Sequence, residues 1–273
     1  MAAQGMNQII DTYSRLAAQY DGDDNAHSCW GLAADKALAS IRLKDRYQVV
    51  MDVGCGTGTA LLRLGARTGP NAYLVGVEPA PNMREAARAR TQHQPQIRIM
   101  EGSFEEIPME SGSVDYVYSI LAFHWTSDVE QSVNELCRVL KPNGEMDLFF
   151  IGRNNGHEFV RKTTPIFLKY MGPVLLLQSA AMRKQLTKDA AFELFERKFA
   201  DRRLTVEESH ETYYDTLERH WSWWVRIEGH FVQIPAAKKI ECDREVKQAL
   251  STLHTAAGIP YTIHLLHVKV RAA

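Results

Sequence analysis

Short apolar runs alternate with amphipathic segments through the central part of the chain, residues 48–152. Short apolar runs bounded by turn residues are typical of strands buried on both faces of a sheet. They are QVVMDV (48–53), AYLVGV (72–77), QIRIM (96–100), SVDYVYSI (113–120) and EMDLFFIG (145–152). Segments of helical periodicity separate them at 58–68, 82–92 and 128–140, the last closed by the stop signal Lys141-Pro142-Asn143-Gly144. This alternation predicts a parallel sheet covered by helices on both faces.

The pattern changes on either side of this central part. Residues 7–20 form a predicted helix that carries Tyr13 and Tyr20 on one face, ahead of the polar turn DGDDN, and 30–41 predicts a second helix. Beyond residue 151 we expect helices and strands in a less regular order: helices at 156–201, 216–229 and 236–256, strands at 203–214 and 261–272. Two further strands separated by helices predict an α/β fold with a seven-stranded, mostly parallel sheet and an antiparallel edge.

The two halves of the chain differ in net charge, although the overall composition is ordinary. The 273 residues are 45% hydrophobic and 24% charged, which is ordinary for a soluble globular protein and rules out a disordered chain. The net charge of −1 conceals a split: residues 1–150 hold 13 basic and 19 acidic side chains, a net of −6, while the remainder is +5. Four cysteines without CxxC or Cys/His spacing predict no metal site and a reducing, cytoplasmic location. No secretory leader and no membrane span are expected.

A glycine-rich turn follows the first strand of the central part, in Asp52-Val53-Gly54-Cys55-Gly56-Thr57-Gly58. Glycines let the backbone turn tightly and approach a ligand without Cβ interference. The spacing is GxGxG, which differs from the GxGxxG of dinucleotide-binding loops. Glu78 ends the next strand, 20 residues after Gly58, where an acid can accept hydrogen bonds from ribose hydroxyls. The sequence therefore predicts a nucleoside ligand.

Four segments together resemble the class I S-adenosylmethionine-dependent methyltransferases, within them the small-molecule branch that includes the ubiquinone, biotin-precursor and trans-aconitate methyltransferases. They are DVGCGTG (52–58), GVEPAPNM (76–83), GSFEEIPMESGSVDYVYS (102–119) and ELCRVLKPNG (135–144). The resemblance covers about residues 10–151. It implies a Rossmann-like fold, S-adenosylmethionine as cofactor with S-adenosylhomocysteine as product, and methyl transfer to an oxygen, nitrogen or carbon atom of a small organic acceptor.

The resemblance also implies roles for individual residues and segments. Gly54, Cys55 and Gly56 would lie along the methionine part of the cofactor, with Asp52 behind them assisting its ammonium group, and Glu78 would bind the ribose. The other expected cofactor contacts are Tyr20 in a lid, Pro79 and Met83 near the adenine, Ser103 (in place of an aspartate common in relatives), Phe104, and Ser119 and Ile120 beside the sulfonium. We expect a helical lid (1–47), a cofactor-binding core (48–151), a helical cap insertion (152–202) and a segment that completes the sheet and acceptor pocket (203–273).

His124 is the candidate catalytic base. It follows the fourth strand at the carboxyl edge of the sheet, where open α/β folds bind ligands, and the ordinary pKa of histidine suits proton removal near neutrality. The alternative is that His124 only fills the loop. The aromatic cluster His220–Trp224 also has two interpretations. It either packs in the core, which is favoured, or forms a wall of an acceptor pocket.

Two further functions stay open from the sequence. The ten basic and four acidic residues between Arg161 and Arg203 would suit an anionic acceptor or RNA. The overall charge of −1 and the lack of an RNA-binding module argue against nucleic acid. Because Ser103 replaces the aspartate, a protein that keeps the cofactor fold without methylating anything is the third hypothesis. The oligomeric state and the identity of the acceptor cannot be read from the sequence.

Overall fold

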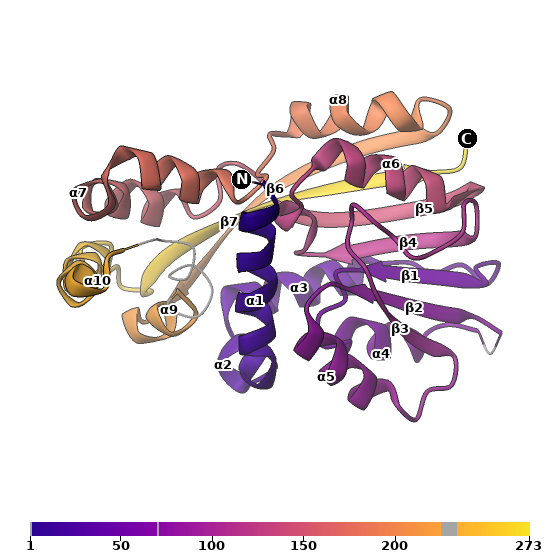
Figure 1. Cartoon of the computed structure of the whole chain (residues 1–273), viewed down its shortest axis with the longest axis horizontal. Helices are drawn as coiled ribbons and strands as arrows, with labels where there is room; N and C mark the ends of the chain where they lie inside the picture. Colours follow the sequence, from indigo (N-terminus) through magenta and orange to yellow (C-terminus); the bar gives the residue numbers. More distant parts are fainter. Residues whose placement is uncertain (1, 70, 225–233) are drawn as a thin grey trace.

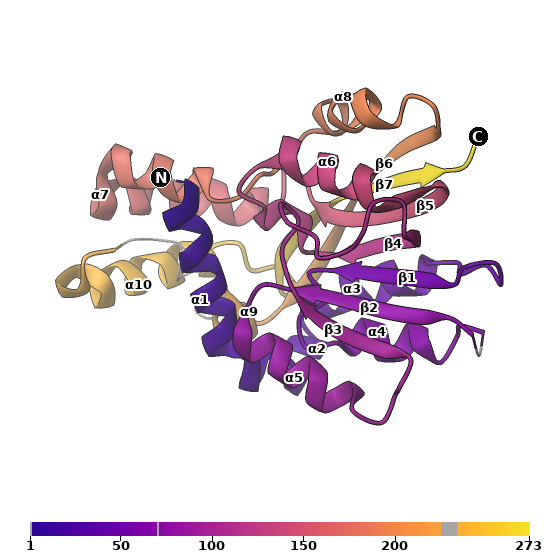
Figure 2. The same ribbon diagram turned by 45° about the vertical axis from the view of Figure 1, so that its right-hand side comes forward.

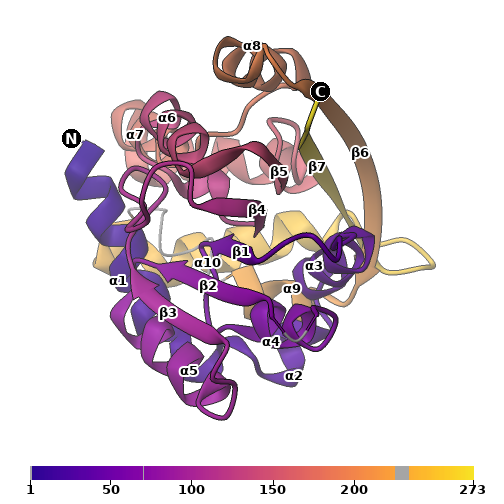
Figure 3. The same ribbon diagram turned by 90° about the vertical axis from the view of Figure 1, so that its right-hand side faces the viewer.

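The computed structural model of the chain describes residues 2–69, 71–224 and 234–273 (Figure 1). Its centre is a seven-stranded sheet, which confirms the predicted fold class. The strands are β1 (Val49–Val53), β2 (Tyr73–Glu78), β3 (Ile97–Glu101), β4 (Val114–Ile120), β5 (Leu140–Ile151), β6 (Arg203–Asp215) and β7 (Ile259–Arg271). Their spatial order is β3-β2-β1-β4-β5-β7-β6, so β3 and β6 lie at opposite edges (Figure 3). β1 to β5 are mutually parallel, and β7 runs antiparallel to β5 and β6.

The helices follow the predicted segments closely. They are α1 (Ala2–Tyr20), α2 (Asp23–Ala26), α3 (Cys29–Ser40), α4 (Thr59–Gly65), α5 (Pro81–Thr91), the 3₁₀ helix η1 (Phe123–Trp125), α6 (Val129–Val139), α7 (His157–Ala181), α8 (Lys188–Phe199), α9 (Leu217–Trp223) and α10 (Ala236–Ser251). The short helix α2 lies where a polar turn was predicted, which corrects that prediction. Residues 225–229 of the predicted helix 216–229 lie outside the described residues.

Polar side chains at the first positions of several helices explain where these helices begin. The Asp128 carboxylate accepts a hydrogen bond from the Gln131 N–H ahead of α6, and Ser28 caps α3 in the same way. Such caps satisfy N–H groups that the first turn of a helix leaves unpaired. These caps fix where α3 and α6 begin.

The predicted stop signal Lys141–Gly144 does not form a separate turn after α6. α6 ends at Val139 as expected, but Lys141-Pro142-Asn143-Gly144 lies inside β5. The register between β4 and β5 shifts there, since Val114 pairs with Leu140 and Tyr116 with Glu145. The proline lacks an N–H to donate to the neighbouring strand, so the segment forms a bulge at the start of the strand.

Apolar side chains from alternate positions of the strands build two cores, one on each face of the sheet. On β1, Met51 and Val53 pack in the core beneath α6 and α8, while Val50 packs against α3 and α4. Figure 1 shows α6 and α8 on one side of the sheet and α4 and α5 on the other. Burial on both faces explains why these strands appear as continuous apolar runs in the sequence.

A third core lies beyond the end of the sheet. α7, α9 and α10 pack there around Phe159, Trp223 and Trp224 against the first residues of β7, and Figure 1 shows these helices as a separate lobe. This burial confirms the interpretation of the aromatic cluster as core. The expected cap 152–202 is divided, because α7 joins this lobe while α8 packs on the sheet through Leu194 and Phe195. Within the described residues, no helix has the length and apolar character needed to cross a membrane.

Candidate functional site

The glycine turn forms a tight loop at the carboxyl end of β1. The N–H groups of Gly54 and Cys55 both donate to the Val77 carbonyl oxygen, at 2.8 and 3.1 Å, which ties the loop to the end of β2. Gly54 and Gly56 have φ values of +77° and +54°. Residues with a Cβ rarely adopt such values, so glycine is required by the backbone at both positions.

The surroundings of the two glycines differ. A Cβ at Gly54 would lie 2.4 Å from the Ala122 Cβ, so the loop packs closely against the segment after β4. A Cβ at Gly56 would meet no atom within 4 Å. The backbone at Gly56 is therefore open to a ligand, as the glycine spacing predicts.

Glu78 lies next to this loop, at the end of β2, with only 7% of its surface exposed. Its two carboxylate oxygens accept hydrogen bonds from the N–H groups of Gly56 and Ala80, each at 2.9 Å. Burial raises the pKa of Glu78, and the two N–H groups and Arg84 oppose the rise. Each carboxylate oxygen can accept a further hydrogen bond, so the side chain can hold a ligand with two hydroxyl groups.

Asp52 and Cys55 are buried behind the loop. Burial raises the pKa of Asp52 to about 8; the Tyr118 hydroxyl opposes the rise, and Glu78 adds to it. Burial also raises the pKa of the Cys55 thiol, with Asp52 and Glu78 contributing. A cationic ligand would favour the ionised forms of Asp52 and Glu78.

A cleft of about 740 Å³, its open mouth included, lies over this loop. Nine of the predicted cofactor residues line it: Tyr20, Gly54, Gly56, Glu78, Pro79, Met83, Ser103, Phe104 and Ile120. The predicted residues Asp52, Cys55 and Ser119 do not, because their side chains point into the protein behind it. We call this the cofactor cleft.

Helix α1 forms a wall of the cofactor cleft. Tyr13 and Tyr20 pack edge to face at 6.0 Å and line the cleft together with Ile9 and Ile10. Burial raises the pKa of Tyr20 to about 12, with Asp21 and Glu78 adding to it, so its hydroxyl stays protonated. Figure 2 shows α1 crossing the edge of the sheet next to α5.

Asp21, immediately after α1, ties this helix to the glycine loop. Its carboxylate accepts hydrogen bonds from the Thr57 hydroxyl at 2.9 Å and from Arg90 at 2.7 Å. Arg90 also donates to the Thr57 carbonyl oxygen at 2.8 Å. These contacts hold the end of α1 against the loop and explain why Tyr20 faces the cleft.

A second cleft of about 470 Å³, its mouth included, adjoins the first. The two clefts share Tyr13, Tyr20, Leu121 and Trp125. The second is also lined by Asn25, Trp30, His124, Ile151, Asn155, Arg183 and Gln185. We call it the adjoining cleft.

His124 is 5% exposed and lines the adjoining cleft. Burial lowers its pKa to about 3, and the charge of Arg183 adds to the effect. Its Nδ1 atom has no hydrogen-bond partner among the described residues. The ring is therefore neutral near pH 7 and, in the free protein, a much weaker base than the sequence prediction assumed.

Leu121 separates the two clefts and has an unusual backbone. Its φ is +57°, the one positive value among the described residues other than glycine. Its N–H donates to the Phe149 carbonyl oxygen at 2.7 Å, which holds this conformation. A bulky residue in the left-handed region is strained by about 1–2 kcal/mol, and such strain clusters at functional sites.

Several lining residues were missed by sequence reasoning. Glu105 accepts hydrogen bonds from Thr126 at 2.6 Å and Ser127 at 2.8 Å, and so holds the segment after η1 beside the cofactor cleft. Trp30, Asn155 and Gln185 reach the adjoining cleft from elements far apart in sequence. The one available signal was the basic stretch 161–203, which contains Arg183.

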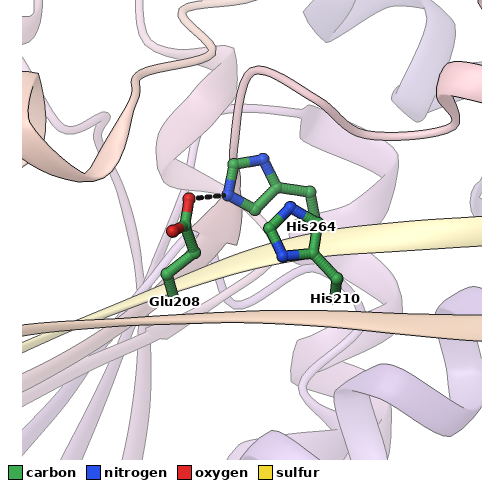
Figure 4. A group of neighbouring side chains, drawn as sticks. All are labelled: Glu208, His210 and His264. Atoms are coloured by element: carbon green, nitrogen blue, oxygen red, sulfur yellow. Dashed lines mark ion pairs between the residues drawn. The ribbon is translucent and has the colours of Figure 1, made fainter.

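Three potential metal ligands meet on β6 and β7, although their sequence spacing did not suggest a cluster: Glu208, His210 and His264 (Figure 4). The Asn154 N–H donates to His264 Nδ1 at 2.9 Å, so the neutral ring carries its proton on Nε2, 2.7 Å from Glu208. For Nε2 to bind a metal, its proton would have to move to Nδ1, where the Asn154 N–H already donates. The His210 and His264 rings are also stacked, with their centroids 4.3 Å apart. We interpret the group as cross-strand packing.

The strand order, the glycine loop at β1 and the buried acid at the end of β2 together define the methyltransferase class that the motifs indicated. Comparison with known proteins agrees. The sequence profile described as a methyltransferase domain matches residues 51–147. A 2-phytyl-1,4-naphthoquinone methyltransferase of Nostoc sp. is 31% identical over 161 residues, which is 56% of this chain and 69% of the relative.

The chain therefore belongs to the S-adenosylmethionine-dependent methyltransferases. An uncharacterized methyltransferase of Mycobacterium bovis is 35% identical over 125 residues, 46% of this chain and 49% of that protein. The chain spans half or less of the length of the first curated relatives it matches. The crystal structure of the YcgJ protein of Bacillus subtilis has the same fold, with a TM-score of 0.61 at 17% identity over 89% of this chain and 99% of that one.

The residues of the cofactor cleft fit the cofactor of this family. S-adenosylmethionine carries a sulfonium and an ammonium group, and the buried acids Asp52 and Glu78 favour positive charge. Glu78 has acceptor capacity for two ribose hydroxyls, and the backbone at Gly56 is open to close approach. The aspartate common after the third strand in relatives is absent, and Ser103 donates no charge there; its hydroxyl accepts from the Glu105 N–H at 3.2 Å.

Proposed function

We propose that the protein transfers the methyl group of S-adenosylmethionine to a small organic acceptor bound in the adjoining cleft. The observation that supports this most directly is the shared wall of the two clefts, formed by Tyr13, Tyr20, Leu121 and Trp125. A donor in one cleft and an acceptor in the other would meet at this wall. The Nostoc relative is named for a 2-phytyl-1,4-naphthoquinone, which supports an acceptor that contains a ring.

In the proposed methyl transfer, the main task of the protein is to align the acceptor with the methyl group. S-adenosylmethionine supplies a methyl group activated by the sulfonium, and its transfer leaves S-adenosylhomocysteine. The chain's part is to hold the acceptor atom in line with that group, which contributes roughly 7–11 kcal/mol in well-oriented reactions. The aromatic wall and the strained Leu121 are the groups proposed to set this alignment.

The test begins with calorimetry of S-adenosylhomocysteine binding to the wild-type protein. Absence of binding would sink the cofactor assignment. A screen of acceptors for S-adenosylhomocysteine production follows, with small aromatic and aliphatic compounds and with RNA. Binding of the cofactor without product from any acceptor would favour a non-methylating protein, and salt-sensitive methylation of RNA would favour the nucleic-acid alternative.

A first prediction concerns the charge of His124. Because burial and Arg183 lower its pKa to about 3, we expect its ring to stay neutral from pH 8 down to about pH 4. Nitrogen-15 shifts of the ring in a histidine-labelled sample measure this, with His93, an exposed histidine on the same protein, as internal reference. Titration of His124 near pH 6.5 would contradict the prediction.

The role of His124 as a base is a separate proposal. If it removes a proton from the acceptor, His124→Ala lowers turnover by at least ~100-fold while cofactor binding is unchanged. A loss smaller than tenfold removes it from that role. Since the free ring is such a weak base, the base role requires that the bound acceptor raise the pKa.

A second prediction links cofactor binding to pH through Asp52. In the free protein this side chain holds its proton up to pH about 8. A bound ammonium beside it favours the carboxylate, so binding expels the proton. Affinity for S-adenosylhomocysteine should then rise by up to about tenfold per pH unit between pH 6 and 8. The Asp52→Asn variant has no proton to release at this position. Its affinity for S-adenosylhomocysteine should therefore change far less with pH.

Calorimetry at several pH values measures this difference between wild type and Asp52→Asn. The groups that face Asp52 are Tyr118, Cys55 and Glu78; the pKa of each is raised, and Glu78 is the other carboxyl among them. Glu78→Gln therefore has to be measured in parallel, at cofactor concentrations that still saturate it. An equally steep profile in Asp52→Asn would assign the proton to another group.

A further inference from the structure

The adjoining cleft differs from the cofactor cleft in charge. The cofactor cleft contains the acids Glu78 and Glu105, whereas among the described residues no carboxylate side chain lines the adjoining cleft. Arg183 lines it, the only one of the ten basic residues between Arg161 and Arg203 to do so. The adjoining cleft is therefore positive where the cofactor cleft is negative.

Arg183 lines this cleft from the segment between α7 and α8. It is half-buried, and its guanidinium lies over the Trp125 ring, 5.5 Å from the centroid. Its effect on the pKa of His124 indicates that its charge is felt inside the cleft. Arg183 has further interactions in the protein, and the five N–H donors of a guanidinium allow it to serve an additional partner.

Two side chains that line the same cleft each carry a buried polar atom without a hydrogen-bond partner in the described part of the chain. Trp30 Nε1 and His124 Nδ1 have no hydrogen-bond partner among the described residues. Such orphans are rare in proteins, and each costs about 1–3 kcal/mol when left unpaired. An indole N–H can only donate, so its missing partner is a hydrogen-bond acceptor such as an oxygen atom.

Aromatic rings form part of the lining of the adjoining cleft, beside aliphatic and amide side chains. Tyr13 and Tyr20 from α1, Trp30 from α3 and Trp125 from η1 surround the cleft, and the Tyr13 and Trp125 rings pack edge to face at 6.0 Å. Aromatic side chains bind planar rings through stacked and edge-to-face contacts. A planar molecule fits these walls better than a branched aliphatic one.

From these four observations we infer that the acceptor is a planar aromatic compound bearing an anionic oxygen, which Arg183 binds through its guanidinium and Trp30 through its indole N–H. The inference rests on the proposed function, because it names what occupies the acceptor side of the site. It also assigns a role to the positive charge of the second half of the chain: one arginine of the basic stretch selects the acceptor, and the others do not line either cleft.

A matched pair of probes tests the charge requirement. 2-Naphthoate and 2-naphthamide share ring and carbonyl oxygen but differ in charge. With the protein saturated with S-adenosylhomocysteine, calorimetry or saturation-transfer NMR should find naphthoate bound at least about tenfold more tightly, since bonds to charged groups are the stronger ones. Equal binding of the two probes, or no saturable binding of naphthoate, overturns the inference.

Variants then locate the preference. Arg183→Gln should reduce the naphthoate preference to within about twofold, and Arg183→Lys should restore part of it. Lys184→Gln is the matched control, because Lys184 is the adjacent cation, donates to the Ala181 carbonyl oxygen and lines neither cleft. Trp30→Phe removes the N–H and should weaken both probes several-fold. A preference that survives Arg183→Gln, or falls equally in Lys184→Gln, contradicts the assignment.

The experiments distinguish a failure of the inferred acceptor class from a failure of the proposed methyl transfer. Binding of S-adenosylhomocysteine to the wild-type protein is measured first, without any acceptor probe. If it binds and naphthoate shows no advantage, the acceptor class is wrong and the proposed methyl transfer stands. If it does not bind, the proposed function itself fails. Thermal unfolding of each variant shows whether a loss of binding reflects a loss of folding.

Discussion

Replacement of Glu78 with glutamine should weaken binding of S-adenosylhomocysteine by about 100-fold or more. The two carboxylate oxygens face the N–H groups of Gly56 and Ala80 at 2.9 Å, so the amide nitrogen of a glutamine would oppose one donor with another. The variant also loses the charge that strengthens bonds to two ribose hydroxyls, each worth about 1.5–3 kcal/mol. Isothermal calorimetry measures the change in dissociation constant.

The neighbouring strand offers a matched control for this experiment. Glu101 ends β3 and pairs in register with Glu78, but its side chain is 75% exposed and forms an ion pair with Arg84 at 2.9 Å. Exposed pairs contribute about 0–1 kcal/mol, so Glu101→Gln should leave the affinity within a few-fold of wild type. If Glu78→Gln binds as well as Glu101→Gln, Glu78 is not a cofactor ligand.

Removal of the Asp147 carboxylate should lower the free energy of unfolding by about 3–5 kcal/mol. Asp147 is 3% exposed on β5 and accepts hydrogen bonds from His267 at 2.6 Å, from Arg271 at 2.8 Å and from the Tyr116 hydroxyl. Asp147→Ala would leave these donors without their central acceptor. Urea unfolding measures the difference.

Glu207→Ala is the control for this second experiment. Glu207 lies on the adjacent part of the sheet and pairs with Lys269, but 57% of its side chain is exposed, so its loss should cost no more than about 1 kcal/mol. Similar losses for Glu207→Ala and Asp147→Ala would show that burial of the network contributes nothing.

The stability contribution of Asp147 also has a defined pH dependence. Burial raises the pKa of this carboxyl, but the bonds from His267, Arg271 and Tyr116 outweigh it and leave the pKa below the ordinary value of 3.8. An acid with a lowered pKa stabilises the fold above its unfolded pKa, and the contribution disappears as pH falls through the folded pKa. Wild type should therefore lose its advantage over Asp147→Ala only below about pH 4.

The cofactor cleft was predictable because its glycine loop and its acid follow local rules at the ends of predicted strands. Gly54, Gly56 and Glu78 all lie at the carboxyl ends of neighbouring parallel strands, and such ends meet at one edge of a sheet. The apolar runs defined the strands, and the strands positioned the loop. The same reasoning placed Asp52, Cys55 and Ser119 near the cleft, but it could not distinguish residues that line it from those buried behind it.

The positions that failed or were missed depend on contacts between distant segments. Lys141–Gly144 has the composition of a turn, yet pairing of β4 with β5 draws it into the strand as a bulge. His124 stands at the predicted edge, but its low pKa comes from burial and from Arg183, about sixty residues away in sequence. A sequence pattern records neither burial nor distance between such residues.

By itself, the sequence determined the alternating sheet, the nucleoside loop, the acid that faces it and the family. Hydrophobic periodicity and glycine spacing act over a few residues, so they can be read along the chain. Only the tertiary structure decided that Trp30, His124 and Arg183 share one cleft beside the cofactor cleft, because three segments far apart in the sequence bring them together. The adjoining cleft is a product of long-range packing, and the sequence alone could not show that one arginine of the basic stretch lines it.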